Sequence, residues 1–272
     1  MGAQSWRAWS AAAGDLLLGA VCPGCRQPGW GLCPACRADL TARRPTLVPN
    51  GRGSAPMTMA CCSYDALLSR LVTAHKESGA LGLAPVLAAR LAASVHALLR
   101  AASWSGPVVL VPVPSAAAAV RRRGYDATAT LARSAARQLR PSRQVRVRSL
   151  LAQRRGVRDQ AGLRAAERQA NLTGALRLRR GPVRGWSEGA VMVLVDDVVT
   201  TGSSLAEAAR VLQAAGLAVL GAATVAAVKD PRTGHGAASA VTRPPADHRR
   251  DVGPARSSET THPALENRGR QD

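Results

Sequence analysis

The chain has 272 residues, 46% of them hydrophobic, which is enough to bury the core of one large domain or of a medium-sized domain with appendages. Its formal net charge of +20 at pH 7 favours polyanionic partners such as pyrophosphates, nucleic acid or an anionic membrane surface. No uninterrupted apolar run reaches the roughly 18 to 20 residues that a membrane-spanning helix needs. We therefore exclude membrane insertion and expect a cytoplasmic protein with an anionic partner.

The N-terminal segment predicts an amphipathic helix, with Trp6, Trp9, Leu16 and Leu17 on its apolar face. A secretory or lipoprotein signal ending at Cys22 is the alternative, but an acidic residue interrupts its apolar stretch. The amphipathic helix explains the segment better.

Four of the six cysteines form two C-x-x-C pairs separated by seven residues, Cys22 with Cys25 and Cys33 with Cys36. Each pair can form a metal knuckle, and two knuckles make a closed tetrahedral thiolate site for structural Zn²⁺. Two disulfides are the alternative, which the lack of a credible export signal disfavours. The segment has too few apolar residues to fold unaided, so metal would supply its stability. We expect residues 1–50 to form this zinc-binding module with the preceding helix.

From about Met57 the chain alternates short β-rich runs with Ala/Leu-rich helical stretches, which predicts an α/β domain with a parallel sheet flanked by helices over residues 57–229. Cys61 and Cys62 fall in its first strand, where buried inert thiols are the default. Residues 230–272 are rich in Pro, Gly, Ser, Thr and Arg and are expected to be a disordered tail. The expected strands are 57–62, 107–113, 144–150, 191–195 and 217–228, and the expected helices are 66–76, 84–99, 127–139 and 204–215, the last ended by Gly216.

Most of the positive charge lies between Arg100 and Arg184, where Asp126, Asp159 and Glu167 are the only acids. The basic residues are almost all Arg, which suits bidentate phosphate contacts, although a compositional bias of the source genome would give the same preference. The basic surface therefore belongs to the middle of the fold.

A buried strand over 191–195 runs into two acids, two valines and a hydroxyl-rich turn that opens a helix. Ligands of open α/β sheets gather at the carboxyl ends of the strands, and the N–H groups of such a turn can surround a phosphate beside the positive helix end. The paired acids suit the 2- and 3-hydroxyls of a ribose. The expected ribose 5-phosphate site comprises Asp196, Asp197, Val198, Val199, Thr200, Thr201, Gly202, Ser203 and Ser204.

Two other interpretations of this segment are weaker. A strand end followed by a helix cap would need one Ser or Thr, and capping does not require two acids. A Walker loop places a Lys after its second Gly, and no such Lys is present here, which disfavours a nucleoside triphosphatase.

The segment MVLVDDVVTTGSS at 192–204 resembles the phosphoribosyl-pyrophosphate signature of type I phosphoribosyltransferases. Three further segments and the four-cysteine module narrow the resemblance to the ComF family of competence-associated, phosphoribosyltransferase-like proteins. The segments are AHKESG at 74–79, VPVPSAAAAVRRRGYD at 111–126 and DQAGLRAAERQANLTGAL at 159–176. Together they cover most of the chain up to about residue 229.

The resemblance implies a pyrophosphate loop with Arg121, Arg122 and Arg123, and a pyrophosphate contact for Lys76. A charge run is also typical of a solvated face, and a cation near a helix C-terminus also satisfies the helix dipole. The family usually has Asn or a similar polar residue where this chain has Asp126, which adds a negative charge. The expected catalytic residues are Asp196, Asp197, Lys76 and Arg123.

Residues 153–162 form a polar, basic, glycine-flanked stretch that predicts a loop. By resemblance this loop closes over the reacting centre and excludes water, with Arg154, Arg155 and Gln160 as candidates. Asn171 matches a family position whose physical role the sequence does not give.

The resemblance implies an enzyme that binds 5-phosphoribosyl-1-pyrophosphate with Mg²⁺ and transfers the phosphoribosyl group to a nitrogen acceptor that the sequence does not identify. The alternative is a non-catalytic competence protein that binds single-stranded DNA or a DNA-handling partner such as a competence helicase. The charge fits the alternative, but the 3% aromatic content does not, because single-strand binders usually stack bases on aromatic side chains.

Overall fold

The computed structural model describes residues 21–49, 55–77, 81–154, 174–179 and 189–228, all within one compact unit. The predicted N-terminal helix, the predicted tail at 230–272, and Arg155, Gln160 and Asn171 lie outside the described residues.

The main sheet has six strands in the order β1-β2-β8-β7-β3-β4. Every neighbouring pair is parallel except β1 and β2, so the predicted parallel sheet is confirmed and gains one antiparallel edge strand. That edge strand was not predicted because three mostly exposed residues carry no periodic signal. The strands are β1 (Thr46–Val48), β2 (Thr58–Ser63), β3 (Val108–Pro112), β4 (Val145–Val147), β7 (Val191–Val199) and β8 (Val219–Ala227).

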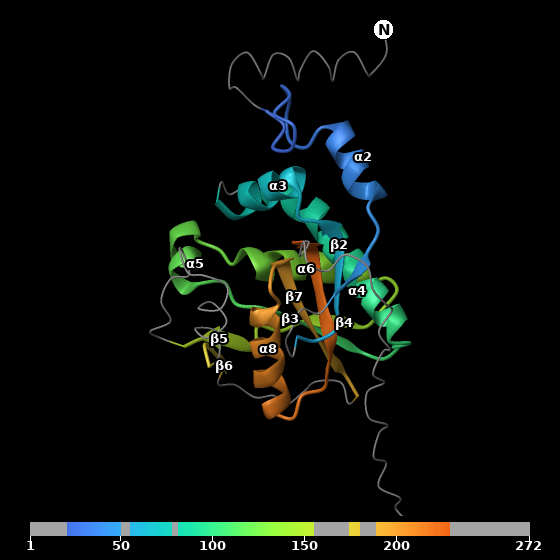
Figure 1. Ribbon diagram of the computed structural model, residues 1–272, viewed down its shortest axis with the longest axis vertical. Coiled ribbons are helices and arrows are strands. Elements are labelled where there is room, and N and C mark those ends of the chain that lie inside the picture. Colours follow the sequence, from blue (N-terminus) through green and yellow to red (C-terminus); the bar gives the residue numbers. More distant parts are fainter. Residues whose placement is uncertain (1–20, 50–54, 78–80, 155–173, 180–188, 229–272) are drawn as a thin grey trace, which may run out of the picture. The chain divides into compact units, whose positions relative to one another are not determined.

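Helices cover both faces of this sheet (Figure 1). Val193 and Val195 of β7 pack into one apolar cluster with α4 and α6, whereas Met192 and Leu194 pack with α8 on the other face. This two-sided burial explains why β7 reads as a continuous apolar run rather than an alternating one. The helices of the domain are α3 (Ala66–Glu77), α4 (Ala84–Ala101, preceded by the 3₁₀ turn η1, Leu81–Leu83), α5 (Ala117–Arg123), α6 (Ala127–Leu139) and α8 (Ser203–Ala214).

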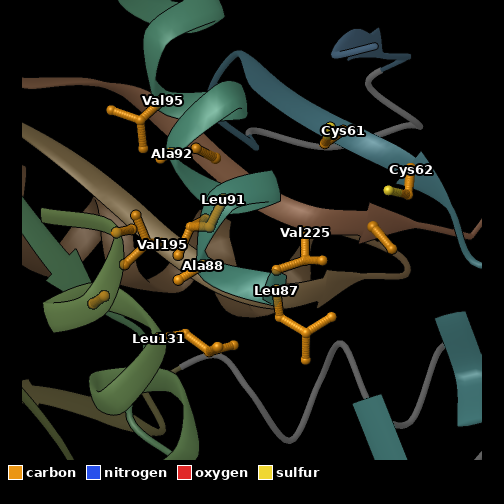
Figure 2. Packing of buried hydrophobic residues seen from close by; sticks show 14 of the residues in the cluster. Cys61, Cys62, Leu87, Ala88, Leu91, Ala92, Val95, Leu131, Val195 and Val225 are labelled. Carbon is orange, nitrogen blue, oxygen red and sulfur yellow. The ribbon is translucent and has the colours of Figure 1, made fainter. Parts of the chain in front are cut away.

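The centre of the core is formed by α4, whose apolar residues recur at helical spacing (Figure 2). Leu87 and Leu91 belong to the same buried cluster as Val225 of β8 and Leu131 of α6. The small side chain of Ala88 lies on the same stripe and is completely buried, which permits close packing between elements. By length and mean hydropathy α4 is the one helix among the described residues that could cross a membrane, and its apolar residues pack in the core of the domain.

The prediction of one strand over 144–150 was wrong in its extent. β4 ends at Val147, and β5 (Leu151–Gln153) pairs antiparallel with β6 (Leu176–Leu178) in a separate two-stranded sheet. The Arg148 N–H still donates to Leu110 O of β3, whereas Leu150 O accepts from Arg179, so the chain leaves one sheet and enters another within three residues. Sequence alternation continues through this junction and does not reveal the change of partner.

The four-cysteine segment is attached to the α/β domain by arginines. It continues into α2 (Pro34–Ala42), whose last carbonyls accept from Arg90 Nη1 of α4, at 3.0 Å for Leu40 O. Arg43 then forms an ion pair with Asp65, 2.7 Å between Nη1 and Oδ2, at the start of α3. Because Asp65 Oδ1 also accepts from the Leu68 N–H, this contact joins the end of α2 to the first turn of α3.

We expect Leu91→Ala to lower the free energy of unfolding by about 2 to 5 kcal/mol, because it leaves a cavity at a fully buried position between α4 and the sheet. Urea unfolding followed by circular dichroism measures the change. The control Leu47→Ala, at a side chain 41% exposed on β1, should stay within about 0.5 kcal/mol of the wild type. Equal losses from both variants would contradict this assignment of the core.

Candidate functional site

The acid pair lies inside β7 rather than after it, because the strand continues to Val199 and stays paired with β8 through Asp196 and Val198. The predicted strand end at residue 195 was therefore too early. Asp197 is only 3% exposed, whereas Asp196 is half-buried and accepts the Asp197 N–H at its Oδ1, 2.8 Å away. The two carboxylates thus differ in their access to a ligand.

Lys76 comes from the last turn of α3 and reaches the acid pair, with 2.7 Å between its Nζ and Asp197 Oδ2. Burial acts to lower the pKa of Lys76, but the Asp197 and Asp196 carboxylates outweigh it and raise that pKa above its usual value. The lysine therefore stays charged at neutral pH. The structure brings together Lys76 and the acid pair, which were separate candidates in the sequence.

Asp196 has a strongly perturbed titration. Burial and then the Asp197 charge raise its pKa to about 8, against the opposing effect of Lys76. Without a ligand, a large share of Asp196 is consequently protonated at neutral pH while Asp197 faces the ammonium group. A cation or a ligand hydrogen-bond donor that approaches Asp196 would favour its ionised form. Asp196 is therefore the carboxyl of the pair whose protonation would change when a ligand binds.

The hydroxyl-rich turn follows β7 and leads into α8 as predicted. Thr201 Oγ1 and Ser203 Oγ lie 2.9 Å apart, and the Ser203 N–H makes a long 3.4 Å bond to Thr201 Oγ1. Gly202 has a φ of 76°, and a Cβ at this position would lie 3.1 Å from the Ala55 Cβ, so both conformation and space favour glycine. Gly202 gives α8 no side-chain cap, which leaves the positive end of a 12-residue helix beside the hydroxyls of the turn.

The three predicted pyrophosphate arginines occupy the last turn of α5, where a turn rather than a helix was expected. Gly124 then ends the helix in the left-handed conformation with a φ of 77°. Arg121 is exposed, and Arg122 forms an exposed ion pair with Glu77 of α3, 3.2 Å between Nη2 and Oε2. Arg123 Nε donates to Ala119 O at 3.0 Å, while its Nη1 is buried without a hydrogen-bond partner among the described residues.

Two residues that sequence reasoning did not assign fix this region. The Tyr125 hydroxyl donates to the carbonyl of His75, next to Lys76, and so connects the end of α5 with the end of α3. Asp126 is the N-cap of α6, because its Oδ1 accepts from the Ala129 N–H at 3.1 Å and from Ser115 Oγ at 3.2 Å. An acid followed by a helix-forming run was the available signal for this N-cap, a role that Asn would fill equally well.

Of the loop candidates Arg154, Arg155 and Gln160, only Arg154 lies in the described part of the chain, and the predicted loop begins one residue later than expected because Gln153 belongs to β5. Arg154 is exposed directly after β5, and its N–H donates to Ala175 O at 2.8 Å. Glu207 of α8, which the sequence did not single out, accepts the Gly174 N–H at 3.0 Å and is ion-paired with Arg210 at 2.7 Å. This buried carboxylate holds the start of β6 against the helix that follows the hydroxyl-rich turn.

The four-cysteine cluster has the geometry of a metal site. The sulfur atoms of Cys22, Cys25, Cys33 and Cys36 all lie within 4.8 Å of one another, and Cys25 and Cys33 approach to 3.6 Å as free thiols. Zn–S bonds of about 2.3 Å in a tetrahedron require sulfur atoms roughly 3.8 Å apart, so the cluster could bind a metal such as zinc.

The backbone at Gly24 packs closely against the first turn of α3 and against the second cysteine pair. A Cβ at Gly24 would lie 2.7 Å from Leu67 Cδ1 and 2.9 Å from Cys36 Sγ, so only glycine fits between the two pairs and α3. The Gly24 carbonyl also accepts from Arg70 of α3. The cluster therefore rests on the helix that carries Lys76 at its other end.

Comparison with known proteins identifies one family model and two curated relatives. The family model described as "Phosphoribosyl transferase domain" matches residues 77–238. The chain is also 30% identical over 226 residues to the "DNA utilization protein YhgH" of Salmonella typhimurium, and equally to that of Salmonella typhi, covering 75% of this chain and 96% of each relative.

Stability should fall with rising pH because of Asp196. Its pKa in the folded protein, about 8, exceeds the roughly 3.9 of an unfolded Asp, so its contribution is complete below about pH 4 and is lost as the pH rises through 8. We expect the melting temperature of the ligand-free wild type to fall more steeply between pH 5 and 9 than that of Asp196→Asn. Parallel profiles for the two proteins would refute this, and Asp39→Asn, at an exposed carboxyl, should follow the wild type.

Proposed function

The chain belongs to the phosphoribosyltransferase family, among its ComF-like members, and from this membership we propose that it binds 5-phosphoribosyl-1-pyrophosphate. The observation that supports the proposal best is the meeting of Lys76, Asp197 and Asp196 immediately before the hydroxyl-rich turn. Acids for ribose hydroxyls, a cation for pyrophosphate and amides for the 5-phosphate all lie at one end of the sheet.

The ligand's parts match this arrangement in order along the site. Thr200 to Ser204 and the first amides of α8 would hold the 5-phosphate. Asp196 and Asp197 would accept hydrogen bonds from the ribose 2- and 3-hydroxyls, with Val198 and Val199 supporting the strand between the acids and the turn. Arg121, Arg122, Arg123 and Lys76 would neutralise the pyrophosphate. Lys76 can serve the pyrophosphate because its side chain is still 33% exposed beside Asp197.

We further propose that the protein is a transferase. The bond between C1 of the ribose and the pyrophosphate oxygen breaks, the pyrophosphate leaves with the bonding electrons, and a nitrogen of the acceptor forms the new bond to C1. Asp196 and Asp197 would stabilise the positive charge that develops on the sugar, while the arginines stabilise the leaving group. Mg²⁺ bound with the pyrophosphate would supply further neutralisation of that leaving group.

A second candidate function is DNA handling without turnover. It is favoured by the names of the two Salmonella relatives and by the net charge of +20. In that case single-stranded DNA or a DNA-handling partner such as a helicase would replace the acceptor as the biological partner, and the sugar-phosphate site would act only as a binding module.

For the cysteine cluster we propose structural Zn²⁺ in a cytoplasmic protein. Four free sulfur ligands with no position for water or substrate are typical of structural rather than catalytic zinc. The metal would hold the two knuckles against α3, and α3 in turn positions Lys76.

Isothermal titration with 5-phosphoribosyl-1-pyrophosphate and Mg²⁺ tests the sugar site. We expect Asp196→Asn and Asp197→Asn each to weaken binding at least about tenfold, since each removes a charged acceptor of hydroxyl hydrogen bonds worth roughly 1.5 kcal/mol or more. Asp39→Asn on α2 is the matched control and should bind as the wild type does. If the wild type shows no heat of binding under conditions where it is folded, the proposal fails.

Metal analysis of the purified chain should give one zinc per molecule, and Cys25→Ser should abolish it. Removal of zinc by a chelator should lower the melting temperature of the wild type, because metal binding supplies folding free energy to the module. Cys62→Ala is the control, since this buried thiol of β2 lies outside the cluster, and it should retain the metal. Full zinc content in Cys25→Ser would contradict the four-sulfur site.

A further inference from the structure

A second basic surface lies away from the sugar site. Arginines project from α6, from the loop that follows it and from β4, and five of the six are exposed. Residues 127–154, which contain this surface, include no acid at all. We call it the arginine face; it consists of Arg133, Arg137, Arg140, Arg143, Arg146 and Arg148.

The charge of the arginine face is not neutralised within the described part of the chain. None of the ion pairs found there includes any of its six members. Their hydrogen bonds go to neutral oxygens instead: Arg143 Nη1 donates to Trp104 O at 2.9 Å and Arg140 Nε to Val145 O at 3.4 Å. These carbonyl bonds orient guanidinium groups and leave their charge available for an outside anion.

Three adjoining hollows run across this surface, with volumes of about 570, 430 and 530 Å³. Arg140 lines all three, and the other arginines are distributed among them. Such a row of linked cationic hollows suits an extended anion with repeated charges better than one small molecule in a closed pocket.

Two of the hollows lie at the opposite end of the strands from the sugar site, and the other is lined by α6, β4 and Arg148 at the edge of the sheet. Pro107, Gln144 and Ala190, which line the largest hollow, directly precede β3, β4 and β7. Asp196, Asp197 and the hydroxyl-rich turn belong instead to the carboxyl half of β7 and beyond. The arginine face is therefore separate from the residues assigned to 5-phosphoribosyl-1-pyrophosphate.

The residue composition of the arginine face indicates whether an acidic protein, a DNA duplex or single-stranded DNA fits it best. Protein partners usually require apolar anchors, and the exposed large apolar side chains of the described residues (Val21, Trp30, Leu47 and Val228) all lie outside the arginine face. The largest hollow combines arginines with the half-buried apolar side chains of Pro107 and Ala190, which are available to contact bases or sugars. Bases are accessible for such contacts in a single strand and are stacked inside a duplex.

From these observations we propose that the arginine face binds single-stranded DNA through its phosphates, at a site independent of the sugar site. This inference deepens the second candidate function and rests on it for the choice of DNA. Because the described face offers no exposed aromatic platform, phosphate contacts must supply most of the affinity, and binding should depend steeply on salt and weakly on sequence.

The test is fluorescence anisotropy with a labelled mixed-sequence single strand, measured across salt concentrations on the full chain. Arg146→Gln/Arg148→Gln removes two exposed charges, one in β4 and one directly after it, and we expect about tenfold weaker binding at low salt and a smaller salt slope by about 1.4. The control Arg37→Gln/Arg44→Gln removes the same charge from exposed positions on and after α2 and should bind nearly as the wild type does.

Three outcomes would overturn the inference. The first is an equal loss of DNA affinity in both double variants. The second is displacement of the single strand by saturating 5-phosphoribosyl-1-pyrophosphate with Mg²⁺. The third is binding of duplex DNA or polyglutamate as tightly as the single strand. Titration of the β4 variant with the sugar ligand separates this inference from the proposed function. Wild-type sugar affinity with weakened DNA binding supports two sites, whereas an absence of sugar binding in every protein refutes the proposed ligand and leaves the DNA result to stand alone.

Discussion

The contact between Lys76 and Asp197 is the interaction on which the organisation of the candidate site depends. It joins the end of α3 to the interior of β7 at 2.7 Å and places an ammonium group against a carboxylate that is almost completely buried. A buried ion pair of this kind adds little net stability, but breaking it leaves an uncompensated charge, so it fixes geometry more than it stabilises the fold. Burial and then the nearby Asp197 charge raise the pKa of Asp196, and Lys76 acts against both.

Several neighbouring features keep α3 where this contact needs it. Tyr125 holds the carbonyl before Lys76, Arg43 holds the first turn of α3 through Asp65, and Arg70 ties the middle of the helix to Gly24. The cysteine cluster is therefore more than an appendage, because it packs on the helix that delivers the site's lysine. A metal bound by the cysteine cluster and a ligand bound at the carboxyl end of β7 would both influence the position of α3.

The two ends of the sheet carry contrasting electrostatics. At the carboxyl end of β7, acids and a lysine largely compensate one another in the absence of ligand, and the positive end of α8 lies beside them. At the amino ends of β3 and β4, the arginine face has no acidic counterpart among the described residues. This separation would allow the proposed phosphorylated sugar and an extended polyanion to bind without competing for the same charges.

The sequence by itself determined the fold class, the main strands and helices, the metal-like cysteine pattern and the acid pair with its hydroxyl-rich turn. Each of these depends on local spacing: β7 is a continuous apolar run, α6 has the predicted limits of 127–139, and the two C-x-x-C pairs are short-range. Such signals arise from backbone periodicity and capping, which act over a few residues.

Only the tertiary structure decided which distant residues meet. It paired Lys76 with Asp197 across 121 positions (197 − 76), placed Glu207 against Gly174, and paired β5 with β6 in a separate two-stranded sheet. It also gathered arginines from α6 and β4 on one surface, although in the sequence they read only as a basic stretch. These contacts depend on the order of strands in the sheet and on which face each helix covers, and local periodicity carries no information about either.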